Sequence, residues 1–294
     1  MVEPLDAIVL AAGRASRLGV PKFLLPAGPG QVLLTRVLEL VLGVVRGQVV
    51  VVLGHRAELA RCALAGRPAA GRVRLVENPR YAEGQSSSLK RGLEVLGASA
   101  GAWVFLADMP GLDAERLGEL ARAIQKRPPG SLAVAPCLGG EARPPVFLSR
   151  ELFPALHRLG GDQGARALLR AERERVVCVE WGPGLWSADV DTWADYRSLA
   201  WALGWAEEPP GPPLQPMPTR ALAARIDQAL GAGEAPWLAP GILWLPGQPE
   251  AWWRLSEPYR GAWAVAEAPA HTPGAYLGLL RRAALWALRA GPGH

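Results

Sequence analysis

A loop that combines glycines with cations follows the first apolar run of the sequence. Residues 10–22 read LAAGRASRLGVPK and carry the cations Arg14, Arg17 and Lys22. Small residues let backbone amides approach an anion, and the three side chains add positive charge. The loop has neither the spacing of a Walker loop nor that of a dinucleotide fingerprint. It therefore predicts a polyphosphate site; an ordinary strand-to-helix connection would explain Gly13 but leave the cations without a role.

Two acidic segments are candidates for a metal site. Asp108 ends the apolar run AWVFLAD, and Mg²⁺ prefers one or two carboxylates together with substrate phosphates. A helix cap is the alternative, but Asp113 stands directly before the helical pattern AERLGEL and is the better cap. In the later segment ADVDTWADY, Asp191 and Thr192 suit a helix cap as well as Asp191 suits a metal. We therefore predict that Asp108 binds a metal, and the residues alone leave Asp191 open.

Polar residues also mark the starts of two later helices. The segment ENPRYAEGQSSSLKRGL places Ser86, Ser87 and Ser88 at the beginning of an amphipathic pattern. One serine is enough to cap a helix, so three favour hydroxyl donors around an anion, with capping alone as the alternative. Further on, GGDQGARALL sets Asp162 and Arg166 at another helix start.

Short apolar runs alternate with helical patterns and must position these loops. The predicted strands are residues 6–12, 49–53, 73–76, 102–106 and 131–135, and helical spacing recurs over 89–96 and 117–124. Such alternation predicts an α/β fold with a mostly parallel sheet and helices on both faces. Ligands in these folds bind beyond the carboxyl ends of the strands, where the loops described above would lie.

The last third of the chain differs in composition. Only Trp103 of the 12 tryptophans precedes residue 181, and the segment 207–218, EEPPGPPLQPMP, is too rich in proline for a helix or an internal strand. We predict a domain over residues 1–205 and a Trp/Pro-rich, mainly helical extension over 206–294, with helices at 219–230 and 273–289. The extension is expected to pack on the first domain or on a second subunit, in a homo-oligomer.

Composition and charge argue against several classes of protein. The net charge of +5 is dispersed along the chain, whereas nucleic-acid-binding proteins cluster their cations. No apolar run is long enough to span a membrane, and the amino terminus lacks the basic start of a secretory signal, so we predict a cytoplasmic protein. Cys62, Cys137 and Cys178 form no closely spaced pair and are expected to be buried or inert. The four scattered histidines argue against a histidine-based hydrolase or a zinc site.

Taken in order, LAAGRASRLGVPK, EGQSSSL, LADMP, GGDQGARALL and DVDT resemble the molybdopterin nucleotidyltransferases, most closely their cytidylyltransferase branch, over about residues 5–204. The resemblance implies a three-layer α/β/α nucleotide-binding domain. It also implies Mg²⁺-dependent transfer of a nucleoside monophosphate from an NTP, CTP in this branch, to molybdopterin or a similar small phosphorylated acceptor. Pyrophosphate would be released.

The resemblance also implies a role for individual residues. The triphosphate would be held by the loop residues Ala11, Ala12, Gly13, Arg14 and Arg17 and by Lys22 at the α-phosphate. Asp108 and Asp191 would bind Mg²⁺, which makes Lys22, Arg17 and Asp108 the catalytic group. The base or ribose would contact Gly54 and Asn78, and the acceptor would face Ser86, Ser87, Ser88 and Asp162. Ala12 would disfavour a purine, because family members specific for guanosine carry glycine there.

Two departures from the family pattern and two alternatives qualify this interpretation. Pro144 stands where family members commonly have histidine, and Trp193 and Ala194 replace a proline and an acid of the last motif. One alternative is a nucleotidyltransferase for sugar phosphates or other small phosphorylated acceptors, against which the serine triplet favours the molybdopterin branch. The other is a non-catalytic regulatory protein that binds nucleotides, which would not need both metal-binding carboxylates.

Overall fold

The computed structural model describes residues 5–13, 21–25, 27, 31–64, 71–97, 99–161 and 164–205, and four short strands beyond them. The chain divides into two compact units. The first comprises Met1–Arg14, Leu34–Ala57 and Pro68–Ala188, and the second comprises Ala15–Leu33, Glu58–Arg67 and Asp189–His294. The predicted boundary at residue 205 stays a prediction.

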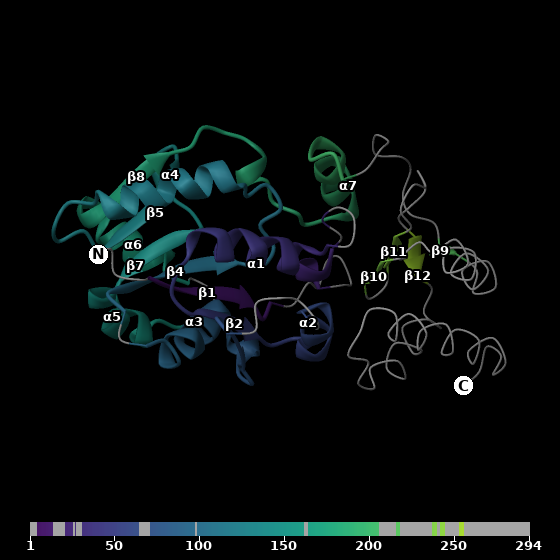
Figure 1. The fold of residues 1–294 in the computed structure, drawn as a ribbon, viewed down its shortest axis with the longest axis horizontal. Helices are drawn as coiled ribbons and strands as arrows, with labels where there is room; N and C mark the ends of the chain where they lie inside the picture. The colour runs from purple at the N-terminus through teal and green to yellow at the C-terminus, as the bar shows by residue number, and fades with distance from the viewer. Residues whose placement is uncertain are drawn as a thin grey trace. The chain divides into compact units, whose positions relative to one another are not determined.

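An eight-stranded mixed sheet forms the centre of the first unit (Figure 1). Its strand order is β3-β2-β1-β4-β7-β5-β6, and β8 also pairs with β5. The first four strands in this order are parallel: β3 (Val73–Glu77), β2 (Val49–Leu53), β1 (Asp6–Ala11) and β4 (Gly101–Leu106). The antiparallel β7 (Val146–Ser149) links β4 to β5 (Ala133–Leu138), which pairs with β6 (Glu141–Ala142) and, in parallel, with β8 (Val176–Glu180).

Helices lie on both faces of this sheet, which confirms the predicted fold class. Figure 1 shows α1 (Leu33–Val44) and α4 (Ala114–Gln125) on one side, and α3 (Gln85–Glu94) and α5 (Phe153–Arg158) on the other. Alternate residues of a strand point to opposite faces. Accordingly, Ile8 and Leu10 of β1 belong to the same buried cluster as Leu89 and Leu93 of α3. The remaining helix bounds are α2 (Ala57–Leu64), α6 (Arg166–Ala171), η1 (Lys22–Leu24), η2 (Tyr81–Glu83), η3 (Arg150–Leu152), η5 (Arg173–Arg175), η6 (Leu185–Ser187) and α7 (Trp193–Ala202).

The described part of the extension is made of strands. It comprises β9 (Pro216–Met217), β10 (Trp237–Ala239), β11 (Ile242–Trp244) and β12 (Trp253–Leu255), which form a sheet in the order β10-β11-β12-β9. The sequence had not predicted these strands. The two predicted helices, at 219–230 and 273–289, lie outside the described residues.

A disulfide bond joins Cys137 and Cys178, a pairing that their distant positions in the sequence did not indicate. The two residues are 41 positions apart in sequence, but their Cα atoms are 5.4 Å apart because β5 and β8 are neighbours in the sheet. Cys137 is fully buried and Cys178 is exposed, and the bridge leaves neither of them a free thiol. Among the described residues, no helix has the length and apolar character that a membrane span requires.

Candidate functional site

The carboxyl ends of the parallel strands bring several of the predicted site residues to one edge of the sheet in the first unit. The His55 amide donates to the Ala12 carbonyl oxygen at 3.3 Å, which joins the ends of β1 and β2. The Asn78 amide donates to the Leu53 carbonyl oxygen at 2.8 Å, which joins the ends of β2 and β3. The Ala107 amide donates to the Leu10 carbonyl oxygen at 3.0 Å, and Asp108 follows at the end of β4. Ala11, Ala12, Gly13, Gly54, Asn78 and Asp108 therefore share this edge.

Close packing at the end of β2 accounts for Gly54. A Cβ atom on this residue would lie 2.6 Å from the Cβ of Tyr81 and 2.7 Å from the Cβ of Ala12. Such distances are shorter than real Cβ contacts, so only glycine fits between these neighbours. The methyl group of Ala12 is itself buried here. The edge where a base is predicted to bind is thus tightly packed before any ligand arrives.

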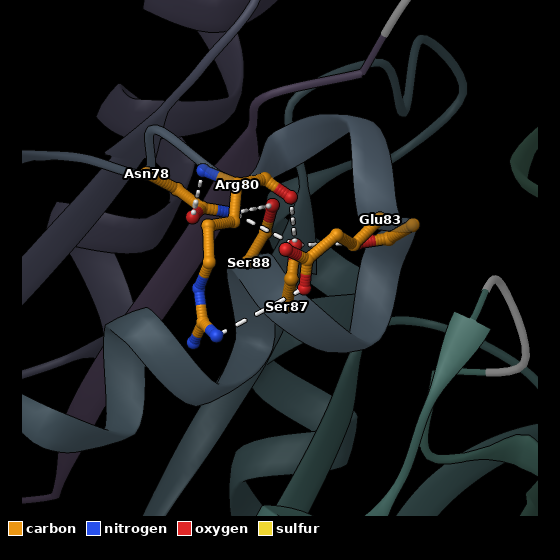
Figure 2. Close-up of polar contacts among 6 residues, drawn as sticks. Asn78, Arg80, Glu83, Ser87 and Ser88 are labelled. Atoms are coloured by element: carbon orange, nitrogen blue, oxygen red, sulfur yellow. Dashed lines mark hydrogen bonds and ion pairs between the residues drawn. The ribbon is translucent and has the colours of Figure 1, made fainter.

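Asn78 is the centre of a buried hydrogen-bond network between β3 and α3 (Figure 2). Its Nδ2 donates to Ser87 Oγ at 2.9 Å and to Ser88 Oγ at 3.0 Å. Its Oδ1 accepts from the Arg80 amide at 3.0 Å, and its side chain is only about 2% exposed. The Ser87 hydroxyl has one hydrogen to donate, and it lies 2.8 Å from the Gly84 carbonyl oxygen and 2.9 Å from that of Arg80. The network fixes the turn between β3 and α3.

These contacts give the serines a structural role that the sequence did not indicate. Figure 2 shows Ser87 and Ser88 turned toward Asn78. All three serines are buried in α3, and Gly84 is the N-cap residue, with a φ of 104° and no side-chain cap. The alternative that one of these serines caps α3 is therefore wrong. Contact of the serines with an acceptor stays a prediction. Sequence reasoning also overlooked Arg80, whose backbone amide and carbonyl both join this network.

Asp113, and not Asp108, caps the helix that follows β4. The Asp113 carboxylate accepts from the Arg116 amide at 2.8 Å and from Arg116 Nη1 at 2.7 Å, which confirms the cap expected at this position. Asp108 is partly exposed after the end of β4. The start of α4 therefore does not need the Asp108 carboxylate. This agrees with the metal assignment, which assumes that Asp108 is not the helix cap.

Lys22 and Asp191 form an ion pair within the second unit, although 169 residues separate them in sequence. Lys22 Nζ lies 3.0 Å from Asp191 Oδ1, and the two side chains are 27% and 46% exposed. Lys22 of the loop at residues 10–22 therefore contacts Asp191 of the segment ADVDTWADY. No spacing in the sequence indicates this contact, because the two segments are joined only by the fold.

Of the two residues that the sequence offered as a helix cap, Asp191 and Thr192, it is Thr192 that caps α7. Thr192 is the N-cap of α7, its Oγ1 accepts from the Asp195 amide at 3.2 Å, and Asp195 Oδ2 accepts from the Thr192 amide at 2.7 Å. This reciprocal pair is a capping box. Asp195 Oδ2 also accepts from the Asp191 amide at 3.2 Å. Because Thr192 and Asp195 supply the cap, the Asp191 side chain is not needed for it.

The hydrogen bonds of this capping box lower the pKa of Asp195 below its usual value of about 3.8. The largest cause is the hydrogen bond with the Thr192 side chain, followed by the one from the Thr192 amide. The positive charge of Lys22 acts in the same direction as a smaller cause. Asp195 is therefore a carboxylate at neutral pH, which supports the cap.

Three of the predicted site residues lie outside the described part of the chain: Arg14, Arg17 and Asp162. Their predicted contacts with the triphosphate and the acceptor stay predictions. Of the predicted catalytic group, the structure describes Lys22 and Asp108, each within its own unit.

Comparison with known proteins identifies a family for the larger part of the chain. Residues 7–176 match the MobA-like NTP transferase domain. The purine catabolism protein PucB of Bacillus subtilis is 32% identical in an alignment 175 positions long, which covers 57% of this chain and 81% of PucB. A bifunctional IPC transferase and DIPP synthase of Rubrobacter xylanophilus is 33% identical in an alignment 238 positions long, which covers 69% of this chain and 53% of that protein.

Solved structures support the same fold. Rv0371c from Mycobacterium tuberculosis H37Rv is 28% identical with a TM-score of 0.56, and the match covers 67% of this chain and 97% of that chain. A second structure of Rv0371c is a complex with manganese; it is 27% identical with a TM-score of 0.54, and the match covers 68% of this chain and 98% of that one.

Proposed function

This chain belongs to the MobA-like NTP transferase domain family and is a nucleotidyltransferase of that type; from this premise we propose that it transfers a cytidylyl group from CTP to molybdopterin or a closely similar phosphorylated acceptor, with a divalent cation. The observation that carries the proposal is the pair of Lys22 and Asp191. It joins the proposed α-phosphate contact to a proposed metal ligand. Both residues belong to one unit, so the fold brings these two opposite charges together.

The chemistry requires little covalent participation by the protein. An oxygen of the acceptor phosphate attacks the α-phosphorus of CTP, a new phosphorus–oxygen bond forms, and the bond to the β-phosphate breaks. Pyrophosphate leaves with the bonding electrons. The acceptor phosphate is already ionised at neutral pH, so no general base is needed. The protein's task is to align two anions that repel each other and to neutralise the charge of the leaving group.

Charged residues of this chain suit that task. Lys22 and Arg17 would hold the phosphates, with Lys22 at the α-phosphate. Asp108 and Asp191 offer carboxylate oxygens, the donors that Mg²⁺ and Mn²⁺ prefer, and neither is the cap of its neighbouring helix. A bound divalent cation would supply charge neutralisation at the phosphates. The manganese complex of Rv0371c supports a divalent cation in this family.

The remaining site residues keep the roles implied by the sequence resemblance. The Ala11–Arg14 segment would surround the triphosphate, and Gly54 and Asn78 would border the base or ribose. Asp162 and the three serines would face the acceptor. The preference for CTP rests on Ala12, whose buried methyl group occupies space beside Gly54 that a glycine would leave to a purine.

A pyrophosphate-release assay tests the proposal. Purified full-length protein is incubated with each of the four nucleoside triphosphates and Mg²⁺ or Mn²⁺, with molybdopterin, with a panel of sugar phosphates, or without an acceptor. We expect release to be greatest with CTP and molybdopterin. Greater release with GTP would remove the cytidylyl assignment, and release that depends on a sugar phosphate would change the acceptor. No acceptor-dependent release with any combination would favour a regulatory protein that only binds nucleotides.

A further inference from the structure

The ion pair of Lys22 and Asp191 places a positive charge where the proposed function needs a metal ion. Lys22 Nζ is 3.0 Å from Asp191 Oδ1, so the ammonium group occupies one of the carboxylate oxygens that a divalent cation would use. Lys22, in turn, is the residue proposed for the α-phosphate. In the absence of ligands, each group therefore holds the other away from its proposed substrate contact.

The two cations compete by charge as well as by position. Both the lysine ammonium and a divalent cation prefer the same carboxylate, and they repel each other when they approach it together. The ion pair itself is weak enough to exchange, because both side chains are partly exposed. Ion pairs of this kind contribute a factor of about five or less to an equilibrium constant. A hard divalent cation with several oxygen ligands can therefore replace the ammonium.

Asp191 can change its partner without any change in the backbone. Its amide is held by Asp195 Oδ2 at 3.2 Å, and the capping box of Thr192 and Asp195 fixes the start of α7. The Asp191 side chain is not needed for this cap. Exchange of Lys22 for another cation at this carboxylate is thus separate from the cap of α7, and both side chains of the pair are partly exposed.

From these observations we infer that Lys22 and the divalent cation compete for the Asp191 carboxylate, so that metal binding releases the Lys22 ammonium for the α-phosphate. This inference rests on the proposed function for the role of the released lysine. The exchange itself is a property of the ligand-free protein. It couples two binding events: the metal arrives at Asp191, and Lys22 becomes available to the nucleotide.

Binding of Mn²⁺ to the full-length protein without nucleotide tests the competition directly. The electron paramagnetic resonance signal of free Mn²⁺ gives the Kd for wild type and for Lys22→Met, Asp191→Asn and Lys126→Met. Lys126 is exposed at the end of α4 in the first unit, so its variant is a control for the lost charge. We expect Lys22→Met to bind Mn²⁺ roughly fivefold to twentyfold more tightly, from the loss of the competing ion pair and of the repulsion. Asp191→Asn should bind at least tenfold more weakly, and Lys126→Met should change Kd less than twofold.

A simple catalytic role for Lys22 leads to a different result. If Lys22 contacts only the nucleotide, Lys22→Met leaves the Kd for Mn²⁺ unchanged, and this outcome, or weaker binding, overturns the inference. Lys22→Gln serves as a second variant, and circular dichroism verifies that each variant is folded. Unchanged Mn²⁺ binding in Asp191→Asn overturns the inference too, because the metal would then not use this carboxylate.

Release of the lysine has its own readout. The chain has three lysines, Lys22, Lys90 and Lys126, so acylation of each is separately measurable by peptide mass spectrometry. We expect Mn²⁺ to raise the acylation rate of Lys22 at least threefold in wild type and not in Asp191→Asn, with Lys90 and Lys126 as internal references. An unchanged rate at saturating Mn²⁺ contradicts the exchange. Neither measurement uses turnover. The pyrophosphate-release assay can therefore fail while the competition is confirmed, and the competition can fail while the assay succeeds.

Discussion

Among single residues, Asp108 gives the most direct test of the metal assignment. Asp108→Asn keeps the shape of the side chain and removes the charge that would hold the divalent cation. Turnover should fall by roughly two or more powers of ten, the usual scale for loss of transition-state charge stabilisation. Binding of the nucleotide without metal should change little. Pyrophosphate release and nucleotide titration measure the two effects, and near-normal turnover at saturating Mg²⁺ would show that Asp108 does not bind the metal.

Asn78 separates a structural role from a ligand contact. Asn78→Ala removes two donated hydrogen bonds and leaves the Arg80 amide without the acceptor described above. The free energy of unfolding, measured by urea titration, should therefore fall by about 2 to 3 kcal/mol. Ser88→Ala removes only one partner of this network and is the control, with an expected loss of about 1 kcal/mol. If Asn78→Ala instead kept its stability and lost only nucleotide affinity, the side chain would act on the ligand rather than on the turn.

Among the elements, α7 depends on a cap whose strength varies with pH. The lowered pKa of Asp195 means that its charged form stabilises the folded state at pH values above its usual pKa of about 3.8. This contribution is lost as the pH falls through the lowered pKa. Asp195→Ala should therefore reduce Tm at pH 7, and the difference from wild type should shrink below about pH 3.8. Asp189→Ala, in the same acidic segment, is the control. An equal difference in Tm at pH 7 and pH 3 would contradict the assignment.

The disulfide joins two elements and should stabilise the fold. The bridge closes a loop with a sequence separation of 41 residues between β5 and β8. In the chain-entropy account, such a loop contributes about 3 to 4 kcal/mol to the free energy of unfolding. Cys178→Ser, or reduction with dithiothreitol, should therefore lower the free energy of unfolding. Cys62→Ser is the control, because Cys62 is not part of this bridge. Titration that finds three reactive thiols in the unfolded, unreduced protein would show that the bridge does not form.

Local pattern predicted the elements whose signals are local. The runs at 49–53 and 102–106 lie in β2 and β4, because continuous apolar strands are typical of a parallel sheet covered on both faces. The strands β6, β7 and β8 were not predicted: β6 and β7 are short, and β8 is only partly buried. Local patterns also could not predict contacts between residues that are far apart in sequence. The Cys137 bridge and the Lys22 ion pair both join residues that only the complete fold makes neighbours.

The disulfide bears on the cellular location that the sequence predicts. The absence of a long apolar run and of a basic start predicted a cytoplasmic protein. Disulfides are rare in cytosolic proteins, with intracellular proteins of hyperthermophiles as an established exception. The bridge of Cys137 and Cys178 therefore bears on a question that hydropathy alone does not address, and the cytoplasmic location stays a prediction.

At the scale of the whole molecule, the family match ends at residue 176, before the extension begins. The match to Rv0371c covers 67% of this chain but 97% of that one. The second unit nevertheless combines Asp189–His294 with Ala15–Leu33 and Glu58–Arg67, so it contains both Lys22 and Asp191. Deletion of the residues after Trp205 would therefore remove most of the unit that carries the proposed α-phosphate contact and one proposed metal ligand.

The described strands of the extension are short. Trp237 pairs with Trp244 across β10 and β11, and Leu243 pairs with Trp253 across β11 and β12. Strands of two or three residues are too short to form a stable sheet alone. This sheet therefore requires support from the rest of the chain or from a second subunit.

Truncation after Trp205 tests whether the extension is an integral part of the molecule. We expect the shortened protein to be poorly soluble or to melt about 5 °C or more below the full chain, since apolar surfaces that the extension is predicted to cover would be exposed to water. Its Kd for Mn²⁺ should also rise, because the unit that holds Asp191 loses most of its residues. Soluble yield, Tm and Mn²⁺ titration measure these effects, and sedimentation of the full chain shows whether a second subunit takes part. A shortened protein with an unchanged Tm, an unchanged Kd for Mn²⁺ and full turnover would prove the extension an independent appendage.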